Sequence, residues 1–131
     1  MTGYLLDTNI VSALVRDPQG PVADRIRAVG EDQVCTSIIV AAELRYGAER
    51  RGSPRLMAQL EAVLRALQVE PFDAPADVAY GLLRTQLERT GQPIGAHDLL
   101  IAAHAIALNC MMVTDNTREF ARVRASRRSH L

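Results

Sequence analysis

The stretch Tyr4-Leu5-Leu6-Asp7-Thr8-Asn9, near the start of the chain, decides the fold. An apolar run that ends on a carboxylate and two helix-capping residues predicts a short buried strand followed at once by a helix. Open α/β folds bind their ligands at the carboxyl ends of parallel strands. We therefore expect Asp7 at a functional sheet edge, although the same residue could simply be the N-cap of the following helix.

The same pattern returns near the other end of the chain. Met111-Met112-Val113-Thr114 is an apolar run that leads into Asp115-Asn116. If both strands belong to one parallel sheet, their ends lie at one edge. Asp115 and Asn116 are also ordinary turn-forming residues, so this motif alone is weak.

Two further acidic residues lie in apolar surroundings. Glu43 falls inside an expected helix over 37–51, and its apolar neighbours leave it either paired with an arginine such as Arg45 or directed into a cleft. Asp98 opens a nearly all-apolar helix over 98–108, where the helix macrodipole also favours a negative charge.

Gathered at one edge, these carboxylates would need a cation. Two carboxylates about 4 Å apart repel by about 4 kcal/mol at an effective dielectric of 20. Oxygen ligands without histidine or cysteine suit Mg²⁺ or Mn²⁺. Such ions activate water and stabilise a leaving oxygen, so the pattern indicates metal-dependent phosphodiester chemistry.

The remaining sequence alternates short apolar strands with helices, which predicts an α/β fold with a mostly parallel sheet covered on both faces. We expect one domain over 1–131, with 126–131 as a mobile tail. The expected strands are 3–6, 33–36, 69–72 and 111–114, and the expected helices are 8–16, 21–29, 37–51, 54–67, 75–90 and 98–108.

Composition narrows the class of protein. The chain has 131 residues, 48% of them hydrophobic, and no net charge. The absence of a leader and of a run of about 20 apolar residues predicts a cytoplasmic protein that does not enter a membrane. Cys35 and Cys110 are expected to be buried free thiols. His104 is expected in the core and His97 at the rim of the site.

All 15 basic residues are arginine. Composition bias of the genome is one explanation for this pattern. The other is that some of these planar guanidinium groups bind phosphate or the carboxylates of a partner.

Four motifs, in this order and at these separations, resemble the PIN-domain ribonucleases, specifically VapC-type toxins of type II toxin–antitoxin systems. They are Tyr4-Leu5-Leu6-Asp7-Thr8-Asn9, Ala42-Glu43-Leu44-Arg45-Tyr46-Gly47-Ala48, Pro93-Ile94-Gly95-Ala96-His97-Asp98-Leu99-Leu100-Ile101-Ala102-Ala103-His104-Ala105 and Val113-Thr114-Asp115-Asn116-Thr117-Arg118-Glu119-Phe120. The resemblance covers essentially the whole chain and implies a three-layer α/β/α sandwich.

The resemblance also implies an acidic site that holds Mg²⁺ or Mn²⁺ and cleaves RNA. Carried over by position, the metal-binding carboxylates are Asp7, Glu43 and Asp98. The site would be completed by Asp115 and Asn116 and supported by Asn9 and Thr114.

One position departs from the family pattern. The fourth carboxylate of the family often falls at the position of Asn116, which carries no charge. Asp115 and Glu119 are both out of the usual register, so the number of metal ions stays open.

The resemblance implies partners as well. These are a VapB-like antitoxin, whose tail places an arginine among the carboxylates, and an RNA substrate that is structured, with tRNA as one class. A homodimer is expected, and DNA would be contacted only through the antitoxin.

Two other functions compete with this interpretation. An aspartyl-phosphate-type phosphatase also begins with an Asp after the first strand, but it needs a second Asp at the position of Asn9 and a lysine, and this chain has neither. A non-catalytic PIN-fold interaction module is the stronger alternative, because the fourth carboxylate is missing.

Overall fold

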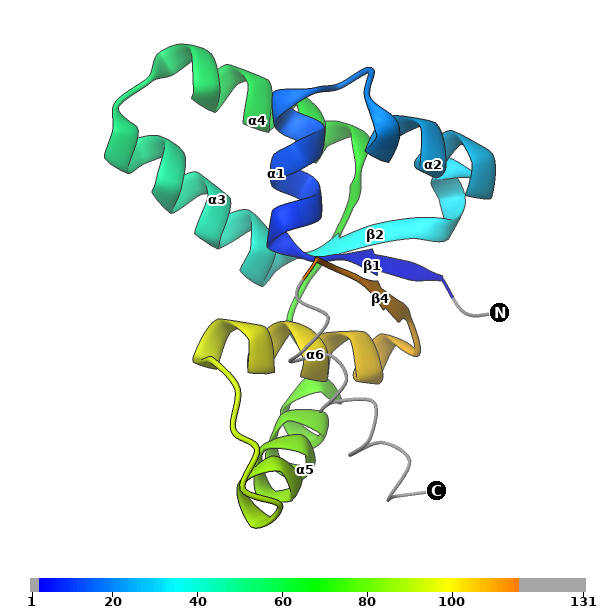
Figure 1. Ribbon diagram of the computed structural model, residues 1–131, viewed down its shortest axis with the longest axis vertical. Coiled ribbons are helices and arrows are strands. Elements are labelled where there is room, and N and C mark those ends of the chain that lie inside the picture. The colour runs from blue at the N-terminus through cyan, green and yellow to red at the C-terminus, as the bar shows by residue number, and fades with distance from the viewer. Residues whose placement is uncertain (1–2, 116–131) are drawn as a thin grey trace.

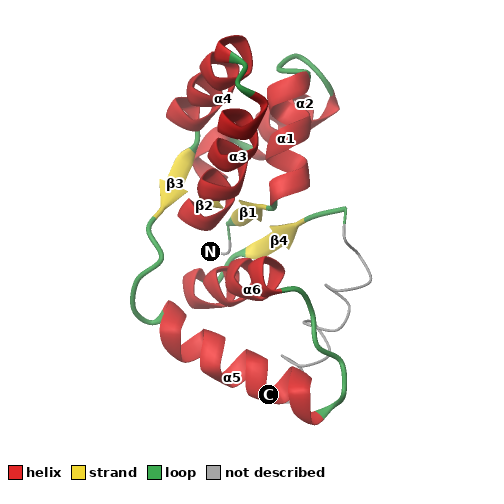
Figure 2. Ribbon diagram, turned by 90° about the vertical axis from the view of Figure 1, so that its left-hand side faces the viewer, coloured by secondary structure: helices red, strands yellow, loops and turns green. Residues whose placement is uncertain are grey.

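The computed structural model describes residues 3–115, and its centre is a four-stranded parallel sheet with the order β3-β2-β1-β4 (Figures 1 and 2). This confirms the expected parallel sheet. The strands are short: β1 (Tyr4–Leu6), β2 (Val34–Ser37), β3 (Gln68–Glu70) and β4 (Met111–Val113).

Helices cover both faces of the sheet, which makes the predicted three-layer sandwich. Helices α1 to α4 pack on one face, and α5 and α6 lie on the other (Figures 1 and 2). Their bounds are α1 (Thr8–Arg16), α2 (Pro21–Val29), α3 (Ile38–Arg51), α4 (Pro54–Ala66), α5 (Ala76–Arg89) and α6 (Ala96–Leu108), with a 3₁₀ turn η1 (Glu31–Gln33) before β2.

The sheet reverses its direction of growth at β1. The chain adds β2 and β3 on one side of β1 and then returns to add β4 on the other side. The carboxyl ends of β1 and β4 are therefore neighbours at a topological switch point, where open α/β sheets form their binding crevice. The backbone N–H of Asp7 donates to the carbonyl of Val113 at 2.9 Å and joins these two ends.

The core explains why the short strands are stable. Leu5 of β1, Val11 of α1 and Val40 of α3 are fully buried in one cluster, which also includes Ile101 of α6. Because β1 is covered from both faces, its apolar residues need not alternate with polar ones.

Most of the predicted boundaries were wrong by one or two residues, whereas α1 and α2 have the predicted bounds. β3 ends at Glu70 rather than residue 72, since Pro71 has no N–H to donate to a neighbouring strand. Helix α6 begins at Ala96, with Gly95 as N-cap, so Asp98 lies within the first turn. The N-cap of α1 is Asp7, which confirms the capping role considered for this residue from the sequence.

The turn between α3 and α4 follows the sequence signals closely. Gly52 ends α3 in the left-handed conformation, with φ of 64°, which favours glycine. Ser53 then caps α4 by accepting from the N–H of Leu56 at 3.2 Å, and Pro54 occupies the first helical position.

Both cysteines are free, as expected from their positions. Cys35 is buried and Cys110 is half-buried. Burial, and next the neighbouring Cys110, raises the pKa of the Cys35 thiol to about 12. The Cys35 thiol is therefore protonated at neutral pH and is a poor nucleophile.

His104 is a core residue, as predicted, and it links two layers of the fold. Its side chain is buried, its Nδ1 lies 2.7 Å from Oγ of Ser37, and its ring meets Phe72 edge to face at 5.1 Å. Burial lowers the pKa of His104, and this outweighs the opposing effects of the Pro71 backbone and the nearby acidic side chains. The ring is therefore held neutral.

Ser37 consequently has two structural tasks. Its Oγ caps α3 by accepting from the N–H of Ile39 at 3.0 Å and also contacts His104. We predict that Ser37→Ala lowers the free energy of unfolding by about 2–4 kcal/mol, because it removes the cap and leaves a buried imidazole nitrogen unpaired.

Ser53→Ala is the matched control, since it removes a helix cap without a buried partner, and it should cost about 1 kcal/mol. Urea unfolding of both variants measures the difference. Equal losses in the two variants would show that the bond to His104 adds nothing.

Three predictions fall outside the part of the chain that the structure describes: the tail over 126–131, Asn116 and Glu119. The single-domain assignment over 1–131 likewise stays a prediction. Within residues 3–115, none of the helices is long and apolar enough to cross a membrane.

Candidate active site at the sheet edge

Asp7 is the most firmly held residue of the edge. Its side chain is only 2% exposed. Oδ1 accepts from the backbone N–H of Thr8 at 2.7 Å, and Oδ2 accepts from Oγ1 of Thr114 at 2.7 Å. The first bond is the helix cap, and the second ties the carboxylate to the end of β4. Asp7 is thus both an N-cap and a residue of the predicted site.

Glu43 reaches this edge from α3. Its Oε1 accepts from Oγ1 of Thr8 at 3.4 Å, and its Oε2 lies 3.7 Å from Nδ1 of His97. Arg45, the partner considered from the sequence, instead forms a two-pronged ion pair with Glu61 at 2.8 and 2.9 Å. Glu43 is therefore directed toward the sheet edge.

The pKa of Glu43 is raised above its usual value. Burial is the largest effect that raises the pKa of Glu43, and the nearby carboxylates of Asp7 and Asp98 raise it further. His97 and the hydrogen bond from Thr8 act in the opposite direction but do not cancel the increase. The three carboxylates that the sequence singled out thus act on one another in the folded protein.

Asp98 lies in the first turn of α6, where the N-terminal end of the helix favours a negative charge. It is partly buried. The preceding N-cap, Gly95, has no side chain, and a Cβ built there would lie 3.8 Å from Oδ2 of Asp98.

The other predicted residues are less closely tied to the site. Asn9 and Asp115 are both exposed. Within residues 3–115, no three histidine, cysteine or acidic side chains lie together closely enough to hold a metal ion as they are. The assignment of Asp7, Glu43 and Asp98 as metal ligands stays a prediction.

Two residues of this edge have contacts that the sequence reasoning did not assign. Thr8 bonds Glu43 through its hydroxyl, and His97 contacts the same carboxylate from α6. In the sequence, only position pointed to these two residues, because Thr8 directly follows Asp7 and His97 directly precedes Asp98.

Comparison with known proteins identifies the family. The family model for the PIN domain matches residues 4–126. The chain belongs to the PIN domain family.

Within this family, the chain is similar to proteins named VapC. It is 36% identical to the tRNA(fMet)-specific endonuclease VapC of Shigella flexneri, over 94% of this chain and 93% of that protein. It is 39% identical to ribonuclease VapC2 of Rickettsia felis, over 92% and 91% respectively. These relatives show that the chain is a member of the VapC family.

Solved structures agree with this placement. The crystal structure of DNA-bound VapBC from Salmonella typhimurium contains a chain that is 33% identical, with a TM-score of 0.85, covering 94% of this chain and 93% of that one. The fold that residues 3–115 adopt is thus the fold of a chain of that VapBC complex.

The raised pKa of Glu43 in this PIN domain gives a pH-dependent prediction. The folded state binds a proton at Glu43 more tightly than the unfolded state, so stability falls as pH rises through the unfolded and then the folded pKa. Glu43→Gln should therefore be more stable than the wild type at pH 7 in metal-free buffer, and this gain should vanish near pH 4.

Urea unfolding at the two pH values measures this difference. Glu49→Gln, on the exposed part of the same helix, controls for the loss of one negative charge. A gain for Glu43→Gln that is the same at pH 4 and pH 7 would contradict the explanation.

Proposed function

We propose that this protein is a Mg²⁺- or Mn²⁺-dependent endoribonuclease and the toxin of a VapBC-type pair, acting in the cytoplasm. The observation that carries the proposal is the meeting of acidic side chains at the switch point of the sheet, where Thr8 hydrogen-bonds both Asp7 and Glu43. The negative charges of Asp7 and Asp98 add to the effect of burial in raising the pKa of Glu43. Membership of the VapC family, whose relatives include named ribonucleases, supports the same activity.

The residues present fit a divalent cation. Their oxygen-only donor set suits Mg²⁺ or Mn²⁺. A cation would offset the negative charges of Asp7 and Asp98, which add to the effect of burial in raising the pKa of Glu43. Mg²⁺ is usually bound through only one or two carboxylates together with water and substrate phosphate. A site without three preassembled ligands is therefore compatible with it, and the half-exposed Glu43 and Asp98 have room to adjust.

We assign the roles from the environment of each residue. Asp7 and Asp98 would hold the ion, which when bound neutralises charge on the phosphate and lowers the pKa of water. Asp7 is pre-oriented by Thr114 and need not reorganise. Glu43 binds the ion or orients the attacking water, and its raised pKa brings it closer to the range of a general base.

We further propose partners of three kinds. A VapB-like antitoxin fits the VapBC complexes of similar structures, and DNA would be contacted only through that antitoxin. An arginine from its tail would pair with the same carboxylates that attract a cation. The RNA substrate is structured, with tRNA the first class to test since the Shigella flexneri relative is named for it. A homodimer is expected.

A second function is a non-catalytic interaction module. The observation that favours it is that no preformed group of three metal-binding side chains exists within residues 3–115. Titration with Mg²⁺ and Mn²⁺ by calorimetry separates the two functions, because the module would bind neither ion at millimolar concentration.

The first functional prediction concerns Asp98. Asp98→Asn keeps the shape of the side chain but removes its charge, so cleavage of total RNA in Mg²⁺ or Mn²⁺ should fall at least 100-fold, and excess EDTA should stop the wild type. Asp77→Asn is the matched control, because Asp77 occupies the first turn of α5 as Asp98 does in α6.

Circular dichroism checks that the Asp98 variant is folded, and mapping of fragment ends identifies the cleaved bonds. Full cleavage by Asp98→Asn, or undiminished cleavage in EDTA, would refute the metal-dependent mechanism.

The second functional prediction concerns Thr114. Thr114→Val removes the hydroxyl that orients Asp7, and the loss of such a supporting bond typically weakens metal affinity or activity 10- to 100-fold. Thr114→Ser keeps the hydroxyl and should retain most activity. The Mn²⁺ affinity and the cleavage rate of both variants measure the effect, and equal values would show that the bond is dispensable.

A further inference from the structure

A groove leads away from Glu43 between α1 and α3. It has a volume of about 210 Å³, and the first turns of α4 close its floor with Leu56 and Leu60. At one end lies Glu43, and the lining includes the arginines Arg16 of α1 and Arg51 of α3. Since eight residues separate Glu43 from Arg51 along α3, the groove extends about 12 Å from the acidic edge.

The middle of the groove is lined by Gly47. This glycine lies inside α3, where glycine destabilises a helix relative to alanine. Its backbone is not in the left-handed region, and a Cβ built on it would meet nothing within 4 Å among the described residues. Neither the helix nor the packing requires a glycine here, so the position leaves open surface for a ligand to approach closely.

The two arginines present their charge to this groove. Within residues 3–115, neither Arg16 nor Arg51 forms an ion pair with a carboxylate, and the hydrogen bond of Arg16 is a long one, 3.4 Å, to Oγ of Ser12. Both side chains are exposed. Their guanidinium groups therefore keep their charge available for an anion.

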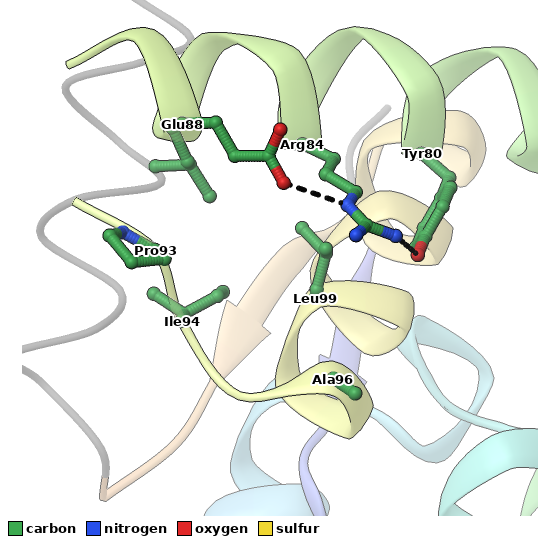
Figure 3. A pocket seen from close by; sticks show the side chains of 8 residues that line it. Tyr80, Arg84, Glu88, Pro93, Ile94, Ala96 and Leu99 are labelled. Atoms are coloured by element: carbon green, nitrogen blue, oxygen red, sulfur yellow. Dashed lines mark hydrogen bonds and ion pairs between the residues drawn. The ribbon is translucent and has the colours of Figure 1, made fainter. Parts of the chain in front are cut away.

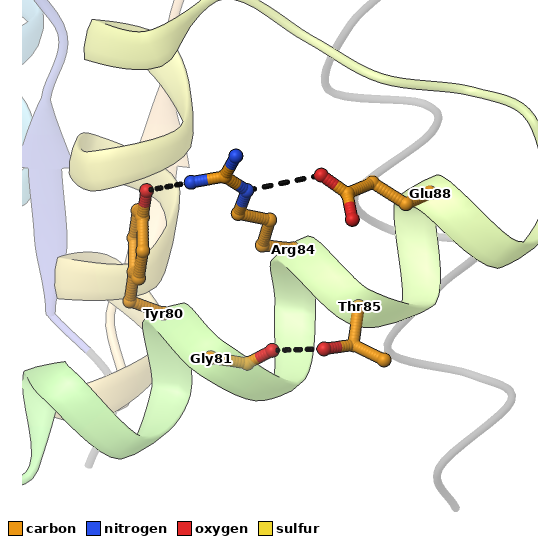
Figure 4. A network of polar contacts seen from close by, with 5 residues as sticks. All are labelled: Tyr80, Gly81, Arg84, Thr85 and Glu88. Atoms are coloured by element: carbon orange, nitrogen blue, oxygen red, sulfur yellow. Dashed lines mark hydrogen bonds and ion pairs between the residues drawn. The ribbon is translucent and has the colours of Figure 1, made fainter.

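Arg84, on the other side of the sheet, differs from Arg16 and Arg51 because it has an acidic partner. Arg84 of α5 lines a pocket that also includes Pro93 and Ile94 (Figure 3). Its guanidinium donates to Glu88 at 3.0 Å and to the hydroxyl of Tyr80 at 2.9 Å, so its charge is already satisfied within α5 (Figure 4). The α1–α3 groove is the better site for an anionic ligand.

Tyr46 adds an aromatic surface beside the groove. It lies three residues after Glu43, on the adjoining face of α3, and is 66% exposed. Exposed aromatic rings next to basic side chains are typical platforms on which single-stranded bases stack.

We propose that the α1–α3 groove binds the RNA strand next to the cleaved bond, with Arg16 and Arg51 holding backbone phosphate over the open surface at Gly47. The proposal rests on the proposed endoribonuclease function. RNA is favoured as the occupant because Glu43, one of the three carboxylates of the proposed site, lines the groove, and the arginines of the groove complement a polyanion. An acidic segment of an antitoxin is the competing occupant.

The test begins with the double variant Arg16→Ala/Arg51→Ala. Fluorescence anisotropy in the Asp98→Asn background, in Mg²⁺, measures binding of single-stranded RNA without cleavage. We expect the affinity to fall about tenfold or more, and the slope of log affinity against log salt to become shallower by about 1.4, for two lost phosphate contacts. In the active protein, KM should rise with little change in kcat.

The matched control is Arg25→Ala/Arg65→Ala, which removes the same charge from exposed positions outside the groove. This control should bind and cleave RNA as the wild type does. If the groove variant binds RNA as tightly as this control, the proposal is overturned.

A second pair of variants tests the open surface. Gly47→Ala and Gly81→Ala both place a methyl group in open space inside a helix, and both should raise the melting temperature by about 4 °C. Only Gly47→Ala should weaken RNA binding. If it binds RNA as tightly as Gly81→Ala, close approach of a ligand at Gly47 is refuted.

Two outcomes separate the inference from the function on which it rests. Failure of the wild type to cleave any RNA would refute the endoribonuclease, whatever the groove variants do. Normal cleavage by the groove variants, together with lost binding of a VapB-like antitoxin, would overturn the RNA proposal and assign the groove to the antitoxin.

Discussion

The arrangement of the site depends on one buried carboxylate. Asp7 is almost fully enclosed, and both of its carboxyl oxygens accept hydrogen bonds, as a buried polar group requires. One bond comes from the first turn of α1, and the other comes from Thr114, which follows β4 and lies 107 residues from Asp7 in the sequence. The same contacts that satisfy Asp7 also hold the edge where β1 and β4 meet. Asp7 therefore contributes both to the stability of the fold and to the candidate active site.

The repulsion among the acidic side chains is the second constraint. Burial and neighbouring negative charge oppose the ionised form of Glu43, and neither His97 nor Thr8 compensates fully. A domain that was selected only for stability would gain from a neutral residue at this position. The unfavourable environment of the Glu43 carboxylate agrees with a site that binds positive charge, either a divalent cation or a guanidinium group of a partner.

The arginines of the chain divide into two kinds. Some are neutralised within the protein, as Arg45 is by Glu61 and Arg84 by Glu88. Others, such as Arg16 and Arg51 in the α1–α3 groove, have no carboxylate partner among residues 3–115. A net charge of zero thus conceals a local alternation of acidic and basic surface. Such an arrangement suits a ligand that is anionic along its length and is held by metal at one point.

The sequence by itself determined the elements of the fold and the identity of the acidic residues. Apolar runs that end on polar residues, together with clear signals such as Gly52-Ser53-Pro54, are local features, and local chemistry decides where strands and helices begin and end. Tertiary structure alone decided which side chains meet. How the helices pack across the sheet decides the contacts Thr114–Asp7, Thr8–Glu43 and Ser37–His104. The same packing places Arg45 against Glu61, and not against its sequence neighbour Glu43. Sequence spacing carries no information on such distances, because each contact joins segments whose relative placement is set by burial of the whole core.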